Sequence, residues 1–259
     1  MISEVIICTN TNAKYDIIEQ INYYNIIGFD RIIIQDNGSL LNLNKLSLLY
    51  KNVICYKNDR QLNQYDSYNY LYRHSIADWV FFSDDDEFLW IDLNKYKNIN
   101  DYITKKSKEL NTNNIAIYWV KVNNYNGIKS RDYNNKEDSQ VKLFKYITPT
   151  YERDAWVKSI YKTGQNIDFS RIHFCTPLNN TKTLNNKIFT ESDLKIANYK
   201  YENDDCLIYH YFFRTYNEFI KKIKYYNLNS LSFDEFCMII YKQNYILKTD
   251  KIYSILYDN

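Results

Sequence analysis

The sequence WVFFSDDDEFLW, residues 79–90, joins two apolar runs through four consecutive acidic residues, Asp84 to Glu87. The first run, WVFFS, has the length and the aromatic content of a buried strand. Repulsion between packed carboxylates at its end needs compensation. A divalent cation would supply it, and carboxylate oxygens suit Mg²⁺ or Mn²⁺. We therefore expect a metal site here; the alternative is a strand end whose charges lie in water.

The segments that precede residue 79 alternate between strand-like and helix-like patterns. β-Branched runs predict strands at residues 4–9, 31–39 and 52–58, and apolar residues at helical spacing predict helices at 14–27, 40–50 and 61–76. Gly28 directly follows the first helix, as a helix stop does. This alternation is typical of a parallel sheet in an α/β fold.

Polar residues follow three of these predicted strands. Thr9 and Asn10 end the first strand, Asp36 and Asn37 end the second, and the acidic run ends the fourth. Open α/β sheets bind ligands at the carboxyl ends of their strands. We expect the three groups to converge on one crevice.

The second half of the chain is less regular. Apolar runs predict strands at 115–122, 141–147 and 157–162, a strand-like run at 207–213, loops at 123–140 and 176–206, and amphipathic helices at 215–228 and 232–246. Ser232 and Glu235 have the spacing of a capping box, which explains the second Asp-Glu-Phe sequence without a catalytic role.

Composition narrows the class of protein. The 259 residues suit one large domain or a domain with a subdomain, and the net charge of +2 without a basic stripe argues against nucleic acid as a partner. Only four glycines are present, so glycine-rich phosphate loops are absent. The five cysteines are odd in number and none has CxxC spacing, which favours a reducing, intracellular compartment. Without a signal peptide or a long apolar segment, we expect a cytoplasmic protein.

The run WVFFSDDDEFL resembles the Trp-apolar-Asp-x-Asp-Glu-Phe-Leu signature of GT-A glycosyltransferases, most of all the group of family 92 and related family-2-like enzymes. Further segments resemble that group in the same order: residues 8–39, QYDSYNYL (64–71), VKSI (157–160) and YHYFFRTYNEFIKKI (209–223). The sequence departs from the group at three places. It has Asn10-Thr11-Asn12 where Asn-Glu is common, and Asp85 where an apolar residue is usual. The region around Trp119 lacks the Phe-Gly dipeptide that is usual in the group.

The resemblance implies a GT-A fold, a Rossmann-like mixed and mostly parallel sheet with helices on both faces, followed by C-terminal helices. It implies a glycosyltransferase domain over 1–225, with a nucleotide-sugar-binding half (1–122) and an acceptor-side half (123–225), and a helical extension at 226–259. Long loops often carry function, so we assign the loops 123–140 and 176–206 to the acceptor side.

The same resemblance implies metal and donor residues. The metal residues would be Asp84, Asp86 and His210: Asp86 would ligate Mn²⁺ (or Mg²⁺) directly, Asp84 would hold ribose or a metal-bound water, and His210 would complete the shell. The nucleotide-sugar residues would be Thr9, Asn10, Asp36, Gln64, Asn69, Asp84, Asp85 and Lys158, with His173 a further donor or acceptor contact. The alternatives are structural: a satisfied core histidine at His210, an ordinary turn at Asp36, helix surface at Gln64 and Asn69, and a solvated Lys158.

Family 92 enzymes invert the anomeric centre, which requires a carboxylate base to deprotonate the acceptor hydroxyl. Glu152 and Asp154 are the candidates, and Asp138 and Asp168 the alternatives. We expect a metal-dependent transferase that moves a hexose, galactose or glucose, from a UDP-sugar to a glycan, glycolipid or glycoprotein. A metal-dependent phosphoryl-transfer enzyme and a non-catalytic carbohydrate-binding protein are the rival hypotheses. The lysine-rich helix YNEFIKKIKYYNL permits association with a membrane surface, although packing on the core is the favoured interpretation.

Overall fold

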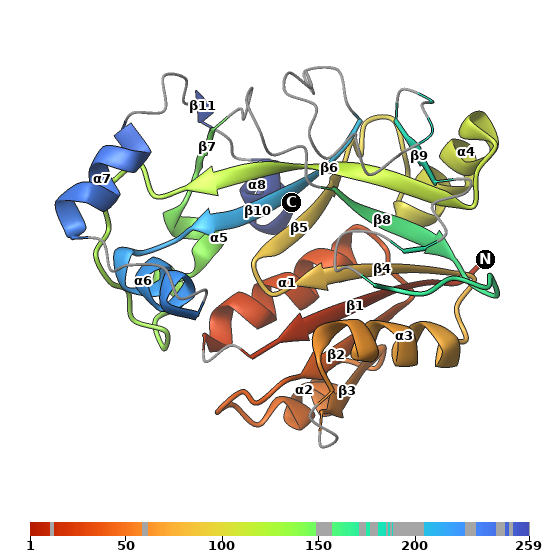
Figure 1. Ribbon diagram of the computed structural model, residues 1–259, viewed down its shortest axis with the longest axis horizontal. Coiled ribbons are helices and arrows are strands. Elements are labelled where there is room, and N and C mark those ends of the chain that lie inside the picture. The colour runs from red at the N-terminus through yellow and green to blue at the C-terminus, as the bar shows by residue number, and fades with distance from the viewer. Residues whose placement is uncertain are drawn as a thin grey trace.

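A mixed sheet of eleven strands forms the centre of the part of the chain that the structure describes (Figure 1). The computed structural model describes residues 1–10, 13–58, 62–148, 157–170, 175–176, 181–184, 186, 188, 205–225, 232–241, 247–248 and 251–258. The main path of the sheet runs in the order β11-β7-β6-β8-β4-β1-β2-β3. Helices cover both of its faces, so the predicted mixed α/β architecture is confirmed.

The first four strands form the parallel half of the sheet. They are β1 (Ser3–Thr9), β2 (Arg31–Asp36), β3 (Val53–Lys57) and β4 (Trp79–Asp84), and they are connected through α1 (Lys14–Ile26), the short helices η1 (Leu43–Lys45) and α2 (Leu46–Leu49), and α3 (Gln64–His74). Thr9 pairs with Asp36 and Cys8 pairs with Asp84, so the three strands end at one edge. The predicted convergence of their carboxyl ends is confirmed.

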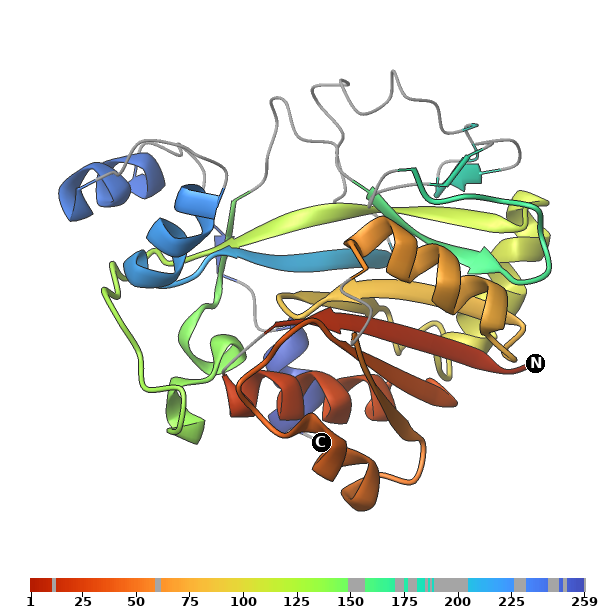
Figure 2. The same ribbon diagram turned by 60° about the horizontal axis from the view of Figure 1, so that its bottom comes forward.

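Side chains of these strands alternate between the two faces, as the pleat requires. Val5 and Ile7 of β1 belong to the large core cluster beneath α1, whereas Ile6 packs with Tyr68 and Leu71 of α3 on the other face. Figure 2 shows α1 and α3 on opposite sides of the sheet. Both faces of β1, β2 and β4 are therefore buried, which explains why the central residues of these three strands are apolar rather than alternating.

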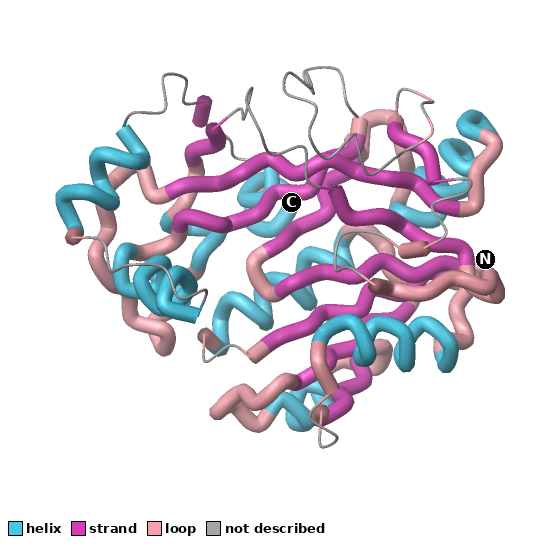
Figure 3. The backbone as a smooth tube through the Cα atoms, viewed as in Figure 1, coloured by secondary structure: helices cyan, strands magenta, loops and turns pink. Residues whose placement is uncertain are grey.

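The second half of the sheet is organised around β6 (Asn114–Asn123), the long strand that crosses the molecule in Figure 3. It is antiparallel to β7 (Tyr146–Thr148) and β8 (Val157–Lys162), and parallel to β9 (Thr181–Thr183) and β10 (Cys206–Phe213). β8 also pairs antiparallel with β4, and β10 with β5 (Glu87–Ile91), while β11 (Leu247–Lys248) extends β7. These pairings join the two halves at the acidic run.

The remaining helices are α4 (Ile99–Leu110), η2 (Lys136–Asp138), α5 (Gln140–Leu143), α6 (Tyr216–Tyr225), α7 (Phe233–Tyr241) and α8 (Lys251–Tyr257). The predicted capping box is confirmed at α7, where Glu235 accepts from the Ser232 backbone at 2.7 Å and Ser232 Oγ accepts from the Glu235 backbone at 3.2 Å. Phe219 of α6 packs on Phe236 of α7. Ile252 of α8 lies in the large core beside α1.

Three segments differ from the predictions. Residues 141–147, predicted as one strand, contain α5 and the start of β7; the Gln140 backbone N–H donates to Asp16 Oδ1 at 3.0 Å, which fixes a helical turn there. The predicted helix at 61–76 begins at Gln64, because Asn63 caps it by accepting from the Asp66 backbone at 2.9 Å. The strand predicted to reach residue 39 ends at Asp36, and the sequence reasoning missed β5, β9 (inside the predicted loop 176–206), β11, α4 and α8.

Candidate functional site

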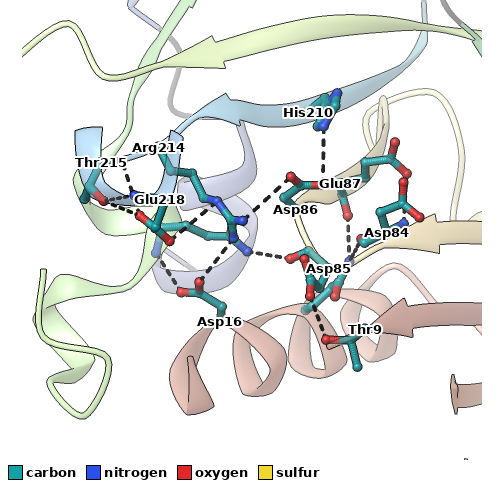
Figure 4. A network of polar contacts seen from close by, with 12 residues as sticks. Thr9, Asp16, Asp84, Asp85, Asp86, Glu87, His210, Arg214, Thr215 and Glu218 are labelled. Carbon is teal, nitrogen blue, oxygen red and sulfur yellow. Dashed lines mark hydrogen bonds and ion pairs between the residues drawn. The ribbon is translucent and has the colours of Figure 1, made fainter. Parts of the chain in front are cut away.

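Asp85 and Asp86 form a two-residue turn that links β4 to β5. The two strands do not pair with one another: β4 continues the parallel half, and β5 pairs with β10. The turn therefore lies where the two halves of the sheet diverge, facing β10 and the start of α6 (Figure 4). Ligand sites of α/β proteins lie at the carboxyl ends of strands where the order of the sheet changes.

Buried side chains hold the backbone of this turn. Gln20 of α1 donates to the carbonyl oxygens of Asp84 and Glu87, both at 2.8 Å, and Gln140 donates to that of Asp85 at 3.0 Å. The backbone N–H of Tyr211 donates to the Asp86 carbonyl at 2.7 Å. Because each carbonyl is held, the acidic side chains are presented by a fixed backbone.

Asp84 is engaged on both carboxylate oxygens. Its Oδ2 lies 2.9 Å from Lys158 Nζ, and its Oδ1 accepts from Gln64 at 2.8 Å and from the Tyr68 hydroxyl at 3.3 Å. Lys158 also lies 2.7 Å from Glu87, and both of these side chains are almost fully buried. Burial alone would lower the pKa of Lys158, but attraction to Asp84 and Glu87 raises it above its ordinary value, so the lysine is charged.

Asp85 connects the turn to β1. Its Oδ2 accepts from Thr9 Oγ1 at 2.7 Å. Burial raises the pKa of Asp85 to about 6, repulsion from Asp86 adds to this rise, and Arg214 opposes it. The Asp85 carboxylate is therefore part of the candidate site.

Asp86 faces the second half of the molecule. Its Oδ1 lies 3.3 Å from His210 Nε2 on β10, and its Oδ2 lies 3.9 Å from the Arg214 guanidinium. The sequence resemblance implied that Asp86 and His210 act together, and the structure brings them together across the turn (Figure 4).

Two arginines with different environments lie beyond Asp86. Arg131 is 1% exposed and holds Asp16 at 2.5 Å and Glu218 at 2.7 Å. Arg214 is 18% exposed and lies 3.6–4.0 Å from Glu218, Asp86 and Asp16, beyond hydrogen-bonding distance. Arg131 is thus a structural cation, whereas the Arg214 guanidinium lies beside Asp86 and, among the described residues, makes only these longer ion pairs with the three carboxylates.

These cations change the argument for a metal. The sequence reasoning required a divalent cation to compensate the acidic run, but Lys158 already compensates Asp84 and Glu87. Within the described ranges, no group of three or more His, Cys, Asp or Glu side chains is arranged to hold a metal ion. A closed cage made by protein ligands alone is therefore not formed by these residues.

A more open metal site does fit the geometry at Asp86. Two ligands of one octahedral cation, each about 2.1 Å from it, lie about 3 Å apart. The 3.3 Å between Asp86 Oδ1 and His210 Nε2 is close to that separation. A carboxylate and an imidazole leave most of the shell to be completed by a substrate diphosphate and water, as Mg²⁺ and Mn²⁺ permit.

The remaining predicted donor residues are Asp36, Asn10 and Asn69, and their contacts lie within the protein or at the strand ends. Asp36 Oδ1 accepts from the backbones of Gly38 and Ser39 at 3.1 and 2.8 Å, which is the ordinary role of Asp in a turn. The Asn37 backbone donates to the Thr9 carbonyl at 2.7 Å, so the ends of β1 and β2 are tied together, with exposed Asn10 beside them. The side-chain amide of Asn69 donates to the Phe169 carbonyl at 3.1 Å and accepts from the Phe169 backbone N–H at 2.8 Å.

The candidate bases are only partly described. Glu152 and Asp154 lie outside the described residues, as does His173, the further donor or acceptor contact. Asp168 pairs with Arg73, and both side chains are 61% exposed. Asp138 accepts from the Asp132 backbone at 3.0 Å.

Sequence reasoning missed Gln20, Gln140, Arg131 and Arg214. A signal was present for Gln20: it lies one helical turn after Asp16, and both polar side chains fall on the buried face of α1. Arg214 follows His210 by four residues in a segment already singled out. Gln140 and Arg131 gave no such signal, because their partners Asp85 and Asp16 are far away in the sequence.

Comparison with known proteins gives fold-level similarities. No protein-family model and no curated protein matches the sequence. The structure is similar to S. aureus TarS 1–349, at 14% sequence identity over 91% of this chain and 68% of that chain, with a TM-score of 0.45. It is also similar to HddC from Yersinia pseudotuberculosis, at 10% identity over 48% of this chain and 64% of that chain, with a TM-score of 0.34. These values carry no argument about activity, and the family 92 resemblance stays a prediction.

No helix in the described ranges combines the length and apolar character needed to cross a bilayer.

Proposed function

We propose that this protein is a nucleotide-sugar-dependent glycosyltransferase whose donor lies across the carboxyl ends of β1, β2 and β4. The observation that carries the proposal is the turn Asp84–Asp86, which faces polar side chains of the nucleotide half on one side and His210 and Arg214 on the other. A nucleotide sugar matches this arrangement: its uncharged nucleoside suits the polar side of the turn, and its diphosphate suits the cationic side.

The nucleoside would occupy the side of the turn formed by Thr9, Asn10 and Asp36. The Asp85 carboxylate is already directed to Thr9 and is the candidate partner of a ribose hydroxyl. Gln64 lies next to Asp84 on the same side, with Nε2 and Oδ1 2.8 Å apart. Base and ribose can therefore be recognised through hydrogen bonds without a glycine-rich phosphate loop.

The diphosphate would lie on the other side of the turn. Asp86 and His210 are the residues that would hold Mn²⁺ or Mg²⁺ there, and the metal supplies charge neutralisation for the departing diphosphate. Arg214 contributes a second positive charge from this chain, since its guanidinium lies in the site beyond hydrogen-bonding distance of Asp86. The acceptor hydroxyl would attack the anomeric carbon with inversion, and the donor would be a UDP-hexose such as UDP-galactose or UDP-glucose.

A thermal-shift panel of nucleotide sugars, each with Mn²⁺ or with EDTA, tests the proposal. We expect UDP and one UDP-sugar to raise the melting temperature with Mn²⁺ and to lose most of this effect in EDTA, because a ligand stabilises the state that binds it. The same UDP-sugar should release UDP slowly in water and faster with an acceptor. Asp86→Asn should lose both effects, while Asp101→Asn on the distant helix α4 should keep them. If no nucleotide sugar shifts the wild-type melting temperature and none is turned over, the proposal is wrong.

The same panel should include samples with metal and without nucleotide. Two protein ligands bind a divalent cation weakly, so Mn²⁺ alone should produce a small shift that grows when UDP is added. A large shift with Ca²⁺ alone, together with glycan binding that needs no nucleotide, would favour the carbohydrate-binding alternative instead.

A further inference from the structure

Three polar side chains lie on the buried face of α1. Asp16, Glu19 and Gln20 are 1%, 4% and 0% exposed. Buried polar groups need hydrogen-bond partners, so the contacts of these residues show which other segments must stay in place. Gln20 holds two carbonyls of the acidic turn, and Asp16 holds Arg131. The partners of Glu19 come from two further parts of the chain.

One partner of Glu19 belongs to a pair of consecutive residues that also reaches the acidic turn. Ser139 Oγ donates to Glu19 Oε1 at 2.5 Å. The next residue is Gln140, whose backbone N–H donates to Asp16 Oδ1 at 3.0 Å and whose side chain donates to the Asp85 carbonyl at 3.0 Å. Because the two residues are adjacent and both are buried, the position of Gln140 depends on the contact of Ser139 with Glu19.

The other partner of Glu19 is Tyr257 of α8, the helix that lies beside α1 (Figure 2). Its hydroxyl donates to Glu19 Oε1, the same oxygen that Ser139 contacts. Lys142 Nζ of α5 lies 4.9 Å from the centre of the Tyr257 ring. α8 belongs to the helical extension at 226–259, to which the sequence resemblance assigns no role. The structure connects it to the residues that hold the acidic turn.

Contacts other than this hydroxyl anchor α8. Ile252 and Ile255 are buried in the large core, and Lys251 Nζ lies 3.7 Å from the centre of the Trp90 ring on β5. Apolar and cation–π contacts of this kind hold the helix in place without the Tyr257 hydroxyl. Removing that hydroxyl alone should therefore leave α8 docked, so its effect can be separated from loss of the helix.

We propose that Tyr257 positions the acidic turn, acting through Glu19 and the consecutive residues 139 and 140. The two donors meet at one carboxylate oxygen, so loss of one allows the carboxylate to move away from the other. The Asp85 carbonyl ends this series of contacts, and the carboxylates of Asp85 and Asp86 follow the position of their backbone. The effect on nucleotide binding rests on the proposed function, whereas the effect on the turn does not.

Amide hydrogen exchange of the full-length protein tests the effect on the turn without nucleotide. In Tyr257→Phe we expect the peptides that cover residues 84–87 and 139–143 to exchange about tenfold faster than in wild type, because a hydrogen bond to a buried carboxyl group is lost. The peptide that covers β2 should exchange at the wild-type rate. Ser139→Ala, which removes the other donor, should give the same pattern. Glu19→Gln keeps an oxygen for both donors and should exchange like wild type.

Tyr253→Phe is the matched control. It removes a hydroxyl from the same helix, one turn earlier, where the ring centre lies 3.7 Å from Lys145 Nζ, and it should leave the exchange of both peptides unchanged. With Mn²⁺ present, Tyr257→Phe should weaken UDP binding by about tenfold, since residues that support a site from behind its ligands have effects of this size. Tyr253→Phe should bind UDP like wild type.

Three results of the exchange experiment would overturn the inference: unchanged exchange of the turn in Tyr257→Phe, equal acceleration of the β2 peptide, or the same effect in Tyr253→Phe. Equal acceleration of β2 would show that the hydroxyl stabilises the whole fold. Unchanged UDP affinity of Tyr257→Phe, in a protein whose wild type binds UDP, would also overturn it. If wild type binds no UDP but the exchange results are as expected, the proposed function is wrong and the positioning of the turn by Tyr257 is supported.

Discussion

His210 Nε2 lies 3.3 Å from Asp86 Oδ1, so β10 and the turn after β4 present one imidazole and one carboxylate to the same point. Both side chains are nearly buried, at 5% and 8% exposure. This pair distinguishes the acidic run from a solvated strand end, and it is the place where metal and diphosphate are proposed to meet.

Replacing either member of this pair should impair transfer to different extents. Asp86→Asn should lower kcat/KM by on the order of 100-fold or more, because a charged ligand is lost. His210→Asn should lower it less and raise the Mn²⁺ concentration needed for half-maximal activity. The rate of UDP release, measured against Mn²⁺ concentration, checks both. An Asp86→Asn enzyme with wild-type activity and metal dependence would remove Asp86 from the metal site.

Arg214 should contribute to diphosphate affinity. A hydrogen bond to a charged group is worth about 1.5–3 kcal/mol, so Arg214→Gln should weaken UDP binding by about 10- to 100-fold. Uridine, which has no phosphate, should bind both proteins equally in a calorimetric titration. Arg73→Gln is the control, because the pair of Arg73 with Asp168 is exposed. Equal losses for uridine and UDP would indicate a general distortion rather than a phosphate contact.

The main effect of replacing Lys158 should be a lower free energy of unfolding. Lys158→Met leaves Asp84 and Glu87 without their shared cation, and breaking a buried ion pair costs about 3–5 kcal/mol. Urea denaturation measures the loss. Lys105→Met, which breaks the exposed pair with Asp101, should cost less than about 1 kcal/mol. Similar costs for the two variants would contradict the assignment of Lys158 as a buried counterion.

Glu19 should make stability depend on pH. Burial raises the pKa of Glu19 from 4.5 to about 7, although Ser139 and Tyr257 donate to its Oε1 and oppose the rise. A folded-state pKa above the unfolded value gives stability that is complete below about pH 4.5 and is lost as pH rises through about 7. Glu19→Gln should therefore gain stability relative to wild type at pH 8, by at most about 3 kcal/mol, and little at pH 4.

Urea denaturation of both proteins across this pH range supplies the measurement. Glu109→Gln is the control: Glu109 is 57% exposed, and its replacement should change the stability by less than about 1 kcal/mol. A Glu19→Gln profile parallel to wild type from pH 4 to pH 8 would show that folding does not raise the pKa of Glu19.

The first half of the fold could be predicted because its sequence is locally consistent. The apolar runs of β1, β2, β3 and β4 are short and bounded by polar turns, so strand was the only element that suited them. β5 was missed because the acidic run was interpreted as the end of a strand, although β5 follows β4 after only two turn residues. The strand pairs with β10, which a local pattern cannot reveal.

The candidate site was predictable where polar residues end strands, and not where distant segments meet. Asp84, Asp86 and Thr9 follow from strand endings alone. The pairing of Lys158 with Asp84 depends on the antiparallel contact of β8 with β4, which brings residues from opposite halves of the chain together. Arg131 reaches Asp16 only because the loop after β6 returns to α1. Such contacts are set by tertiary packing, which the spacing of residues in the sequence does not encode.

The position of Lys158 on β8 also has a consequence for how the protein is made. When the first half of the chain has left the ribosome, Asp84 and Glu87 are present but the lysine that neutralises both has not been synthesised. β4 also lacks β8 along one edge at that stage. The nascent parallel half should therefore remain open and dependent on chaperones until β8 emerges, and an isolated fragment of residues 1–122 should not reach a stable native state.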